Sequence, residues 1–267
     1  MPVAPDLYSL KRRLDRYFWH NNSPEIVRLR DILNEHFGSF SNVAVVGGLV
    51  RDFAREGRSG FRSDIDLVIE AAEGEVATLA AKLGARPNKF GGFASYCRPW
   101  NIDFWALEAT WASKSGHIRV CQLDDVIKCT FFNWDAALYD VLNRKVICNN
   151  TYLDAIRRRE IDINLRPNPS IYGNLLRSVR RLLLWNLHAG PQLKSFIIEN
   201  LTTECFHSIK ERERSLHSNP VMQHFSDLET LRHQLFERER RVGVYASKTQ
   251  FSLGLEPTIN GRPAARE

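Results

Sequence analysis

The chain of 267 residues has few features of disulfide-rich, zinc-binding or membrane-spanning proteins. Its 5 cysteines are scattered, odd in number and never spaced as Cys-x-x-Cys, which favours buried structural thiols over a disulfide framework or a zinc site. No apolar run approaches the roughly 20 residues that cross a bilayer. The N-terminus lacks the apolar stretch and cleavage site of a signal peptide, so we expect a cytoplasmic protein with no membrane partner.

Motifs for covalent catalysis are also missing. The histidines show no metal-ligand spacing, and no Ser-His or Cys-His nucleophile motif stands out. Hydrophobic residues make up 43% and charged residues 25% of the chain, which indicates an ordinary globular protein. The net charge of +6 is compatible with nucleic acid or nucleotide as a polyanionic partner, although solvated arginine-rich helices would give the same balance.

Hydrophobic periodicity divides the chain into a mixed part, at about residues 40–150, and an all-helical part, at about residues 155–245. The pattern predicts strands at residues 43–46, 64–70, 93–97, 101–107, 118–120 and 145–148. It predicts helices at residues 6–20, 24–37, 49–55, 73–83, 124–140, 192–200, 203–215 and 222–240, and one around residues 175–183 that stops at Gly190-Pro191.

Two aspartates, Asp64 and Asp66, stand at the start of an expected strand with one apolar residue between them. Because alternate residues of a strand point to the same face, their carboxylates would converge. Such hard anionic ligands suit Mg²⁺, which binds a few carboxylate oxygens together with substrate phosphates. Asp103, between apolar neighbours on a later strand, is a candidate third carboxylate. The alternatives are a surface position for Asp103 and an Asp-x-Asp without function, since that pattern is common.

A glycine pair directly follows the first expected strand, in the stretch Gly-Gly-Leu-Val-Arg-Asp at residues 47–52. Gly47 and Gly48 would let the backbone approach a triphosphate, with amide groups and the N-terminus of the next helix facing the anion. A simple turn is the alternative. Arg51 and Asp52 open the expected helix after this turn, and a structural ion pair is one account of them.

These motifs, in this order, resemble the head domain of bacterial tRNA CCA-adding enzymes and their poly(A) polymerase relatives, in the polymerase β-like nucleotidyltransferase superfamily. The family pattern is Gly-Gly-x-Val-Arg-Asp, a short loop that is slightly longer here, and Asp-x-Asp. Residues 123–140 resemble the family segment Asp-Leu-x-Arg-Arg-Asp-Phe-Thr-Ile-Asn-Ala-Leu-Ala-Tyr-Asp. Residues 152–156 stand where the family has Gly-x-x-Asp-Leu, and residues 176–182 resemble its neck-helix pattern Leu-Arg-x-x-Arg-Phe.

The sequence also departs from the family pattern. The Arg-Arg-Asp triplet, which in the family helps to read the ribose and position the nucleotide, is Lys128-Cys129-Thr130 here, so sugar selection is in doubt. No convincing copy of the base-reading Glu-Asp-x-x-Arg element is present, and the helical part is short for a full neck, body and tail. These departures argue against a standard housekeeping CCA-adding enzyme.

The resemblance implies an α+β fold, with a polymerase β-like head of a small mixed sheet and helices followed by an all-helical neck and body. We expect the head with its N-terminal helices at residues 1–150, the neck and body at residues 151–246 and a disordered tail at residues 247–267. The implied reaction is template-independent transfer of NMP from an NTP, ATP or CTP, to an acceptor hydroxyl with release of pyrophosphate. The implied cofactor is Mg²⁺, as two ions, with Mn²⁺ as a substitute, and the implied acceptor is an RNA 3′ end such as that of tRNA.

The implied metal ligands are Asp64 and Asp66, with Asp103 as a third ligand or base. The candidate nucleotide-binding residues are Gly47, Gly48, Arg51, Lys128, Asn133, Arg177 and Arg180. Lys128 would neutralise phosphate or lie in solvent, and Asn133 would order the nucleotide or cap local backbone. Helical spacing puts Arg177, Arg180 and Arg181 on one side of their helix, as a wall facing base or phosphate or as a salt-bridged surface.

Two rival functions stay open. A diverged toxin or defence nucleotidyltransferase that modifies RNA, protein or a small molecule would fit the altered triplet and the short helical part. A catalytically weak nucleotide- or RNA-binding module of a larger complex would also fit the altered triplet, but the three retained aspartates argue against it. A measurement of metal-dependent NTP turnover would distinguish the binding module from the two enzyme hypotheses.

Overall fold

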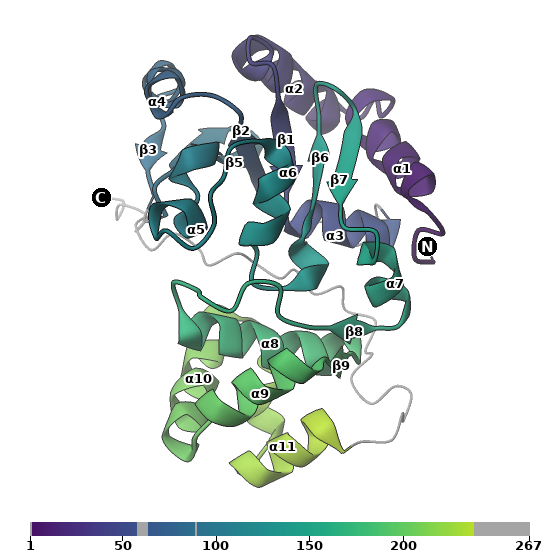
Figure 1. Cartoon of the computed structure of the whole chain (residues 1–267), viewed down its shortest axis with the longest axis vertical. Coiled ribbons are helices and arrows are strands. Elements are labelled where there is room, and N and C mark those ends of the chain that lie inside the picture. The colour runs from purple at the N-terminus through teal and green to yellow at the C-terminus, as the bar shows by residue number, and fades with distance from the viewer. Residues whose placement is uncertain (1, 58–63, 89, 238–267) are drawn as a thin grey trace, which may run out of the picture.

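The computed structural model describes residues 2–57, 64–88 and 90–237. Figure 1 shows a half built on a β-sheet above a half built from helices, from α8 (Ile171–Trp185) to α11 (Leu228–Phe236). The segment around α7 (Tyr152–Arg157) and β8 (Glu160–Ile161) joins the two halves. Most of the loop before the Asp-x-Asp motif, the end of the helix predicted at residues 222–240 and the expected disordered tail lie outside the described residues.

A seven-stranded sheet forms the centre of the first half. Its order is β3 (Arg86–Pro87), β4 (Phe93–Cys97), β5 (Trp100–Ala106), β2 (Ile65–Ile69), β1 (Val43–Val46), β6 (Ala137–Asp140) and β7 (Lys145–Cys148). Neighbouring strands are antiparallel except β2 and β5, which are parallel and in contact along their length. The predicted α+β class is confirmed, and so are the expected strands at residues 43–46, 64–70, 93–97, 101–107 and 145–148.

Each face of the sheet carries its own hydrophobic core. Ile65, Leu67 and Ile69 of β2 point into the larger core, which the N-terminal helices cover. Val68 points to the opposite face, into a smaller core that includes Val126 of α6 (Leu123–Val126), the helix that crosses in front of the sheet in Figure 1. Because side chains alternate along a strand, the residues of β2 on either side of Leu67 belong to the face of the smaller core.

Several helices pack around the sheet. They include α1 (Leu7–Trp19), α2 (Pro24–Ile32), which continues as the π-helical turn η1 (Leu33–Phe37), α3 (Gly48–Arg55), α4 (Glu73–Lys82) and the short α5 (Trp111–Lys114). The Asp6 side chain caps α1 by accepting a hydrogen bond from the Ser9 amide at 2.6 Å. Pro24 occupies the first turn of α2, where its missing amide hydrogen costs nothing. The helices predicted at residues 6–20, 24–37, 49–55 and 73–83 are therefore present.

The prediction of one helix over residues 124–140 is wrong. The chain there forms α6 (Leu123–Val126), the 3₁₀ turns η4 (Ile127–Cys129) and η5 (Asn133–Asp135), and strand β6. All four residues of β6 are buried, since the strand lies between β1 and β7. A short apolar run that is buried on both faces has no strand period, so spacing could not separate it from a helix. The strand expected at residues 118–120 is not formed either.

The second half contains α7 (Tyr152–Arg157), α8 (Ile171–Trp185), α9 (Pro191–Asn200), α10 (Thr203–Leu216), the 3₁₀ turn η6 (Met222–His224) and α11 (Leu228–Phe236). A parallel pair, β8 (Glu160–Ile161) and β9 (His188–Ala189), lies between the two halves. Helix α8 ends earlier than predicted, because Asn186 adopts a left-handed conformation with φ of 50°. Gly190 instead precedes α9 as its N-cap residue.

One hydrophobic core runs through both halves. The larger cluster of buried side chains contains Phe104 and Tyr139 of the sheet together with Val179 of α8 and Leu231 of α11. The helical half is therefore packed directly against the sheet-bearing half. Among the described residues, no helix is both long enough and apolar enough to cross a membrane.

Candidate active site

A glycine turn joins β1 to α3. Gly47 has φ of 68° and ψ of −119°, a left-handed backbone conformation that side chains with a Cβ rarely adopt. A Cβ placed on Gly47 would meet no atom of the described residues within 4 Å, so that part of the chain leaves the space next to this residue open. Helix α3 begins at Gly48, and its first amides point out of the helix because they have no intrahelical acceptor. The turn offers an open, electropositive approach for an anion.

The strand register brings two of the predicted carboxylates side by side. Asp66 on β2 pairs with Asp103 on β5 in the parallel ladder, between the pairs Ile65 with Ile102 and Leu67 with Phe104. Those four neighbours are fully buried, whereas the two aspartates are half-buried. The aspartates therefore lie on the opposite face of the sheet from the larger core, on strands about 4.8 Å apart.

Asp64 and the glycine turn lie at the same end of the sheet. Asp64 immediately precedes β2, and its Oδ1 accepts a hydrogen bond of 3.0 Å from Asn101 Nδ2 on β5. Val45 pairs with Leu67 in the antiparallel ladder of β1 and β2, so Val46 is level with Asp66. The chain then turns at Gly47 beside the start of β2. The structure thus brings the predicted glycine turn and the predicted Asp-x-Asp pair together.

The three carboxylates repel one another in a partly dry site. Burial, followed by the charges of Asp103, Asp64 and Asp135, raises the pKa of Asp66 to about 8. Burial and the charge of Asp64 also raise the pKa of Asp103. Within the described residues, no lysine or arginine side chain pairs with Asp66 or Asp103. The cluster therefore has a negative charge that a bound cation would balance.

The donor set fits Mg²⁺ that is shared with a substrate. As oriented here, no three Asp, Glu, His or Cys side chains of the described residues are gathered so that they alone could hold a metal ion. Mg²⁺ commonly takes one or two protein carboxylates and completes its octahedron with waters and substrate phosphates. Asp66 and Asp103 on adjacent strands, with Asp64 beside them, supply such a partial set of oxygen ligands.

Arg51 is engaged in a buried ionic network. Its Nε donates to Asp52 Oδ1 at 2.9 Å, and its Nη1 donates to Asp135 Oδ1 at 2.7 Å. The second oxygen of Asp135 accepts from Arg181 Nη1 at 2.8 Å. Burial by itself would raise the pKa of Asp135, but Arg181 and Arg51 outweigh it and lower that pKa to about 2. The alternative of an ion pair between Arg51 and Asp52 is therefore the one that the structure shows.

The ring of Trp185 contacts the two arginines of this network and a third arginine, Arg55. The guanidinium carbons of Arg51, Arg55 and Arg181 are 5.0, 4.1 and 5.5 Å from the ring centre of Trp185 on α8. Trp185 also stacks on Trp134, which follows Asn133 in the turn η5, with ring centres 6.1 Å apart. Cation–π contacts of this kind, away from water, hold α3 and α8 together.

The prediction that three arginines of α8 form a wall facing a base or phosphate is wrong, because they do not share an open face. Arg180 is 2% exposed and forms a buried ion pair with Glu213 of α10, so it does not face an open site. Arg181 is also buried, in the network with Asp135, whereas Arg177 is exposed and its Nη2 donates to Asn174 Oδ1. Helical spacing placed the three arginines on one solvent face, but the turn η5 covers part of that face and α10 covers another.

The other two candidates have local partners. Lys128 has a side chain that is 59% exposed, and its Nζ donates to Asp125 Oδ1 at 2.8 Å. Asn133 Oδ1 accepts from the Asp162 amide at 3.0 Å, and the Asn133 amide donates to the Asp162 carbonyl oxygen at 3.0 Å. Asn133 therefore caps backbone, which was one of its two predicted roles, and it does so between η5 and the segment after β8.

Sequence reasoning missed Asp135 and Trp185. An aspartate within the apolar stretch at residues 131–139 was a signal, because a buried carboxylate needs a cation. Its partners lie 84 residues before it and 46 residues after it, so no local pattern could indicate which arginines they are. Trp185 stands one turn after Arg181 on α8, and nothing in the spacing indicated that its ring would contact Arg51 and Arg55 of α3.

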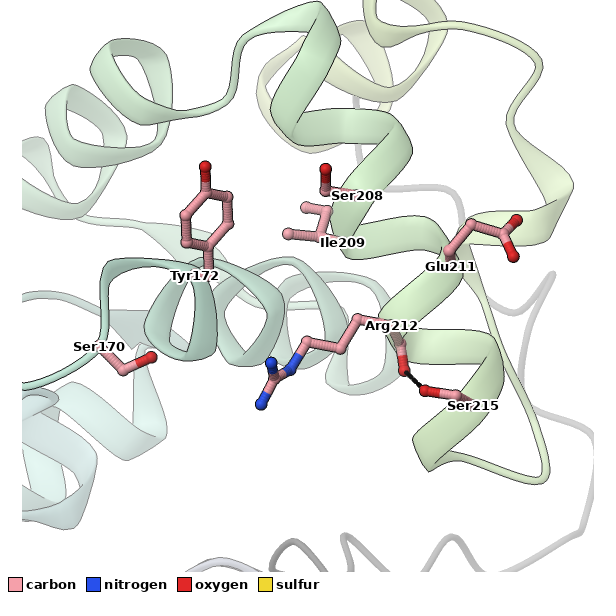
Figure 2. Close-up of a pocket in the computed structure, with 7 residues that line it drawn as sticks. All are labelled: Ser170, Tyr172, Ser208, Ile209, Glu211, Arg212 and Ser215. Carbon is pink, nitrogen blue, oxygen red and sulfur yellow. Dashed lines mark hydrogen bonds between the residues drawn. The ribbon is translucent and has the colours of Figure 1, made fainter.

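A separate hollow lies in the helical half, between the start of α8 and α10. Its volume is about 570 Å³, and it is lined by Ser170, Tyr172, Ser208, Ile209, Glu211, Arg212 and Ser215 (Figure 2). Two of its hydroxyl groups are already used, since Ser170 Oγ caps α8 and Ser215 Oγ donates to the Arg212 carbonyl oxygen. None of the three carboxylates lines it, so it is distinct from the candidate active site.

No known family profile and no curated protein sequence matches the chain. Solved structures do match. A CCA-adding enzyme in an apo form superposes with a TM-score of 0.52 at 18% identity over 78% of this chain and 52% of the other. CCA-adding enzyme complexes with ATP and with CTP give TM-scores of 0.51 and 0.50 at 17% and 18% identity, each over 79% of this chain and 51% of the other.

These matches show that the chain has the α+β fold of the part of the CCA-adding enzymes with which it superposes. The resemblance inferred from the motifs is confirmed at the level of the fold. The chain spans about half the length of the solved structures that it matches.

Proposed function

We propose that the chain is a metal-dependent nucleotidyltransferase that transfers NMP from an NTP to an acceptor hydroxyl and releases pyrophosphate. The observation that carries this proposal is the pairing of Asp66 with Asp103 on adjacent strands, with Asp64 and the open turn at Gly47 at the same sheet end. The fold shared with CCA-adding enzymes supports the same reaction class.

In this proposal, Asp64 and Asp66 hold the metal, and Asp103 is a third ligand or the base that accepts the proton of the acceptor hydroxyl. Bound Mg²⁺ would supply charge neutralisation for the triphosphate and the leaving pyrophosphate. The amides at the start of α3 and the open turn at Gly47 bind the triphosphate and orient its α-phosphate. The acceptor hydroxyl then attacks the α-phosphorus in line, so no covalent enzyme intermediate is needed.

The donor and the acceptor are proposed on different grounds. ATP or CTP is the proposed donor, because CCA-adding enzymes of the same fold have been solved with each of them. An RNA 3′ end, such as that of tRNA, is the proposed acceptor, on the basis of the motif resemblance and the net charge of +6. The charge favours a polyanionic acceptor over a neutral small molecule.

The test is incubation with Mg²⁺, total cellular RNA and each α-labelled NTP in turn. The double variant Asp64→Ala/Asp66→Ala is compared with the wild type and with Asp31→Ala, which removes an exposed aspartate of α2. Labelled RNA from the wild type and Asp31→Ala, but not from the double variant, is the expected result, and the size of the labelled RNA identifies the acceptor class.

Two other outcomes would redirect the proposal. Pyrophosphate release without labelled RNA would favour a diverged toxin or defence enzyme that acts on a protein or small molecule. Neither label nor pyrophosphate with any NTP would contradict the enzyme and favour a nucleotide- or RNA-binding module.

A further inference from the structure

An aspartate links helix α3, whose glycine turn would bind the triphosphate, to helix α8 of the helical half. We propose that Asp135 is a positioning residue for the nucleotidyl transfer: it fixes helix α3, with its glycine turn, and helix α8 in one arrangement beside the three carboxylates. This inference rests on the proposed function, because it assigns Asp135 a role in that reaction.

The geometry of the carboxylate supports this role. Each oxygen of Asp135 accepts a hydrogen bond from a different arginine, Arg51 of α3 at 2.7 Å and Arg181 of α8 at 2.8 Å. The two guanidiniums are 6% and 7% exposed at the side chain, so water cannot readily replace the aspartate. Charge-assisted bonds of this kind are short and directional, and they define the relative position of the two helices.

The ionic network of Asp135 is connected to the glycine turn through Arg51. Arg51 lies one turn into α3, and the Arg51 amide donates to the Gly47 carbonyl oxygen at 3.1 Å. A change in the position of Arg51 would therefore be passed directly to the turn that faces the triphosphate. Trp185, one turn beyond Arg181, contacts Arg51 and Arg55 through its ring, so α8 holds α3 at a second point.

Stability alone is a weak reason for such a network. Burying charged groups costs desolvation energy, and buried ion pairs often contribute no more to stability than apolar side chains of the same volume. What they supply in addition is a defined geometry. Because transfer requires the attacking oxygen and the phosphorus to be about 3 Å apart and in line, a displacement of about 1 Å can slow it about 100-fold.

The test compares two buried ion pairs. Asp135→Asn keeps the shape of the side chain but removes the anion between α3 and α8. Glu213→Gln is the matched control, because Glu213 is fully buried and pairs with Arg180 inside the helical half. For Asp135→Asn we expect the single-turnover rate of transfer to fall about 10- to 100-fold, with the KM for the NTP changed less than about threefold. For Glu213→Gln we expect loss of stability with the wild-type rate.

Hydrogen exchange supplies a readout that does not depend on activity. Asp135→Asn should increase amide exchange in both α3 and α8, whereas Glu213→Gln should increase it in α8 and α10 and leave α3 unchanged. If Asp135→Asn fails to fold, Asp135→Glu keeps the charge and displaces it by one methylene group. The expected result for that variant is a folded protein with a severalfold lower rate.

Several results would overturn the inference. These are a wild-type rate in folded Asp135→Asn or in Asp135→Glu, an equal loss of rate in Glu213→Gln, or unchanged exchange in α3 of Asp135→Asn. A wild-type protein that is inactive with every NTP and acceptor would instead contradict the proposed function. The exchange result would then decide by itself whether Asp135 couples the two helices.

Discussion

At the residue scale, Asp66 combines burial with three neighbouring carboxylates, and this has a consequence for stability. Its raised pKa means that the folded protein without metal holds a proton on Asp66 over a pH range in which the unfolded chain has lost it. The contribution of Asp66 to stability is therefore greatest below about pH 4 and is lost as the pH rises towards about 8.

We predict that in the presence of a chelator the melting temperature of the wild type falls between pH 5 and pH 8. Asp66→Asn should show a shallower fall, because the asparagine does not ionise, and saturating Mg²⁺ should flatten the curve of the wild type by balancing the charge. Thermal unfolding at four pH values, with and without Mg²⁺, measures this. Parallel curves for wild type and variant would show that Asp66 ionises in the folded state as easily as in the unfolded chain.

Gly47 is the second residue whose conformation makes a prediction. Gly47→Ala should cost about 1–3 kcal/mol, because φ of 68° with ψ of −119° disfavours any Cβ even where space is open. It should also weaken NTP binding, since the added methyl group projects into the open side of the turn. Urea unfolding and calorimetric titration with an NTP and Mg²⁺ measure the two effects.

Gly74 provides the matched control for that substitution. It lies in the first turn of α4 without a positive φ, and a Cβ there would also meet nothing within 4 Å. Gly74→Ala should therefore be neutral or stabilise by up to about 1 kcal/mol. If Gly47→Ala and Gly74→Ala change the free energy of unfolding equally, the backbone conformation at Gly47 does not require a glycine.

At the scale of elements, the end of α8 is set by a conformation that the sequence pattern did not reveal. Asn186 has φ of 50° and ψ of 56°, and its amide donates to the Leu182 carbonyl oxygen. This left-handed C-terminal residue turns the chain towards β9 and α9. The apolar stripe of α8, by contrast, would have allowed the helix to continue to Gly190.

We predict that Asn186→Gly is neutral or stabilises the protein by up to about 1 kcal/mol, since glycine adopts this conformation without cost. Asn186→Val should cost about 1–2 kcal/mol, because a β-branched side chain disfavours it. Urea unfolding of the two variants gives the comparison. A neutral Asn186→Val would indicate instead that α8 continues through residue 186, as the sequence pattern predicted.

At the scale of the whole molecule, one core joins the sheet to the helices. Buried side chains of β5, β6, α8 and α11 belong to one cluster. The ionic network of Asp135 and the stacked pair of Trp134 and Trp185 add polar and aromatic contacts between the same parts. We therefore expect the two halves to unfold together.

We predict a single cooperative unfolding transition in urea. Tryptophan fluorescence reports mainly on the sheet-bearing half, because 5 of the 6 tryptophans lie before α8, and far-ultraviolet circular dichroism reports on the helices of both halves. The two signals should have the same midpoint. Midpoints that differ would show that the sheet-bearing half and the helical half are separate folding units.

The sequence was sufficient for features that depend on neighbours along the chain. Alternation predicted that Asp64 and Asp66 share one face, and the apolar neighbours of Asp103 made it the candidate third carboxylate. The glycine pair after β1 predicted a tight turn, which in the structure requires a glycine. The order of these motifs predicted the fold that the solved structures share. Each of these inferences uses backbone geometry that repeats within a few residues.

The features that join distant parts of the chain could be learned only from the folded protein. The parallel register of β2 and β5, the burial of β6 between two strands and the two partners of Asp135 all depend on packing across tens of residues. Helical spacing predicted one side of α8 for Arg180 and Arg181, but the two side chains have different partners. Arg180 pairs with Glu213 of α10, and Arg181 pairs with Asp135 of η5. Local periodicity gives the face on which a side chain lies, but the element that packs on that face determines whether its charge meets solvent, substrate or another charge.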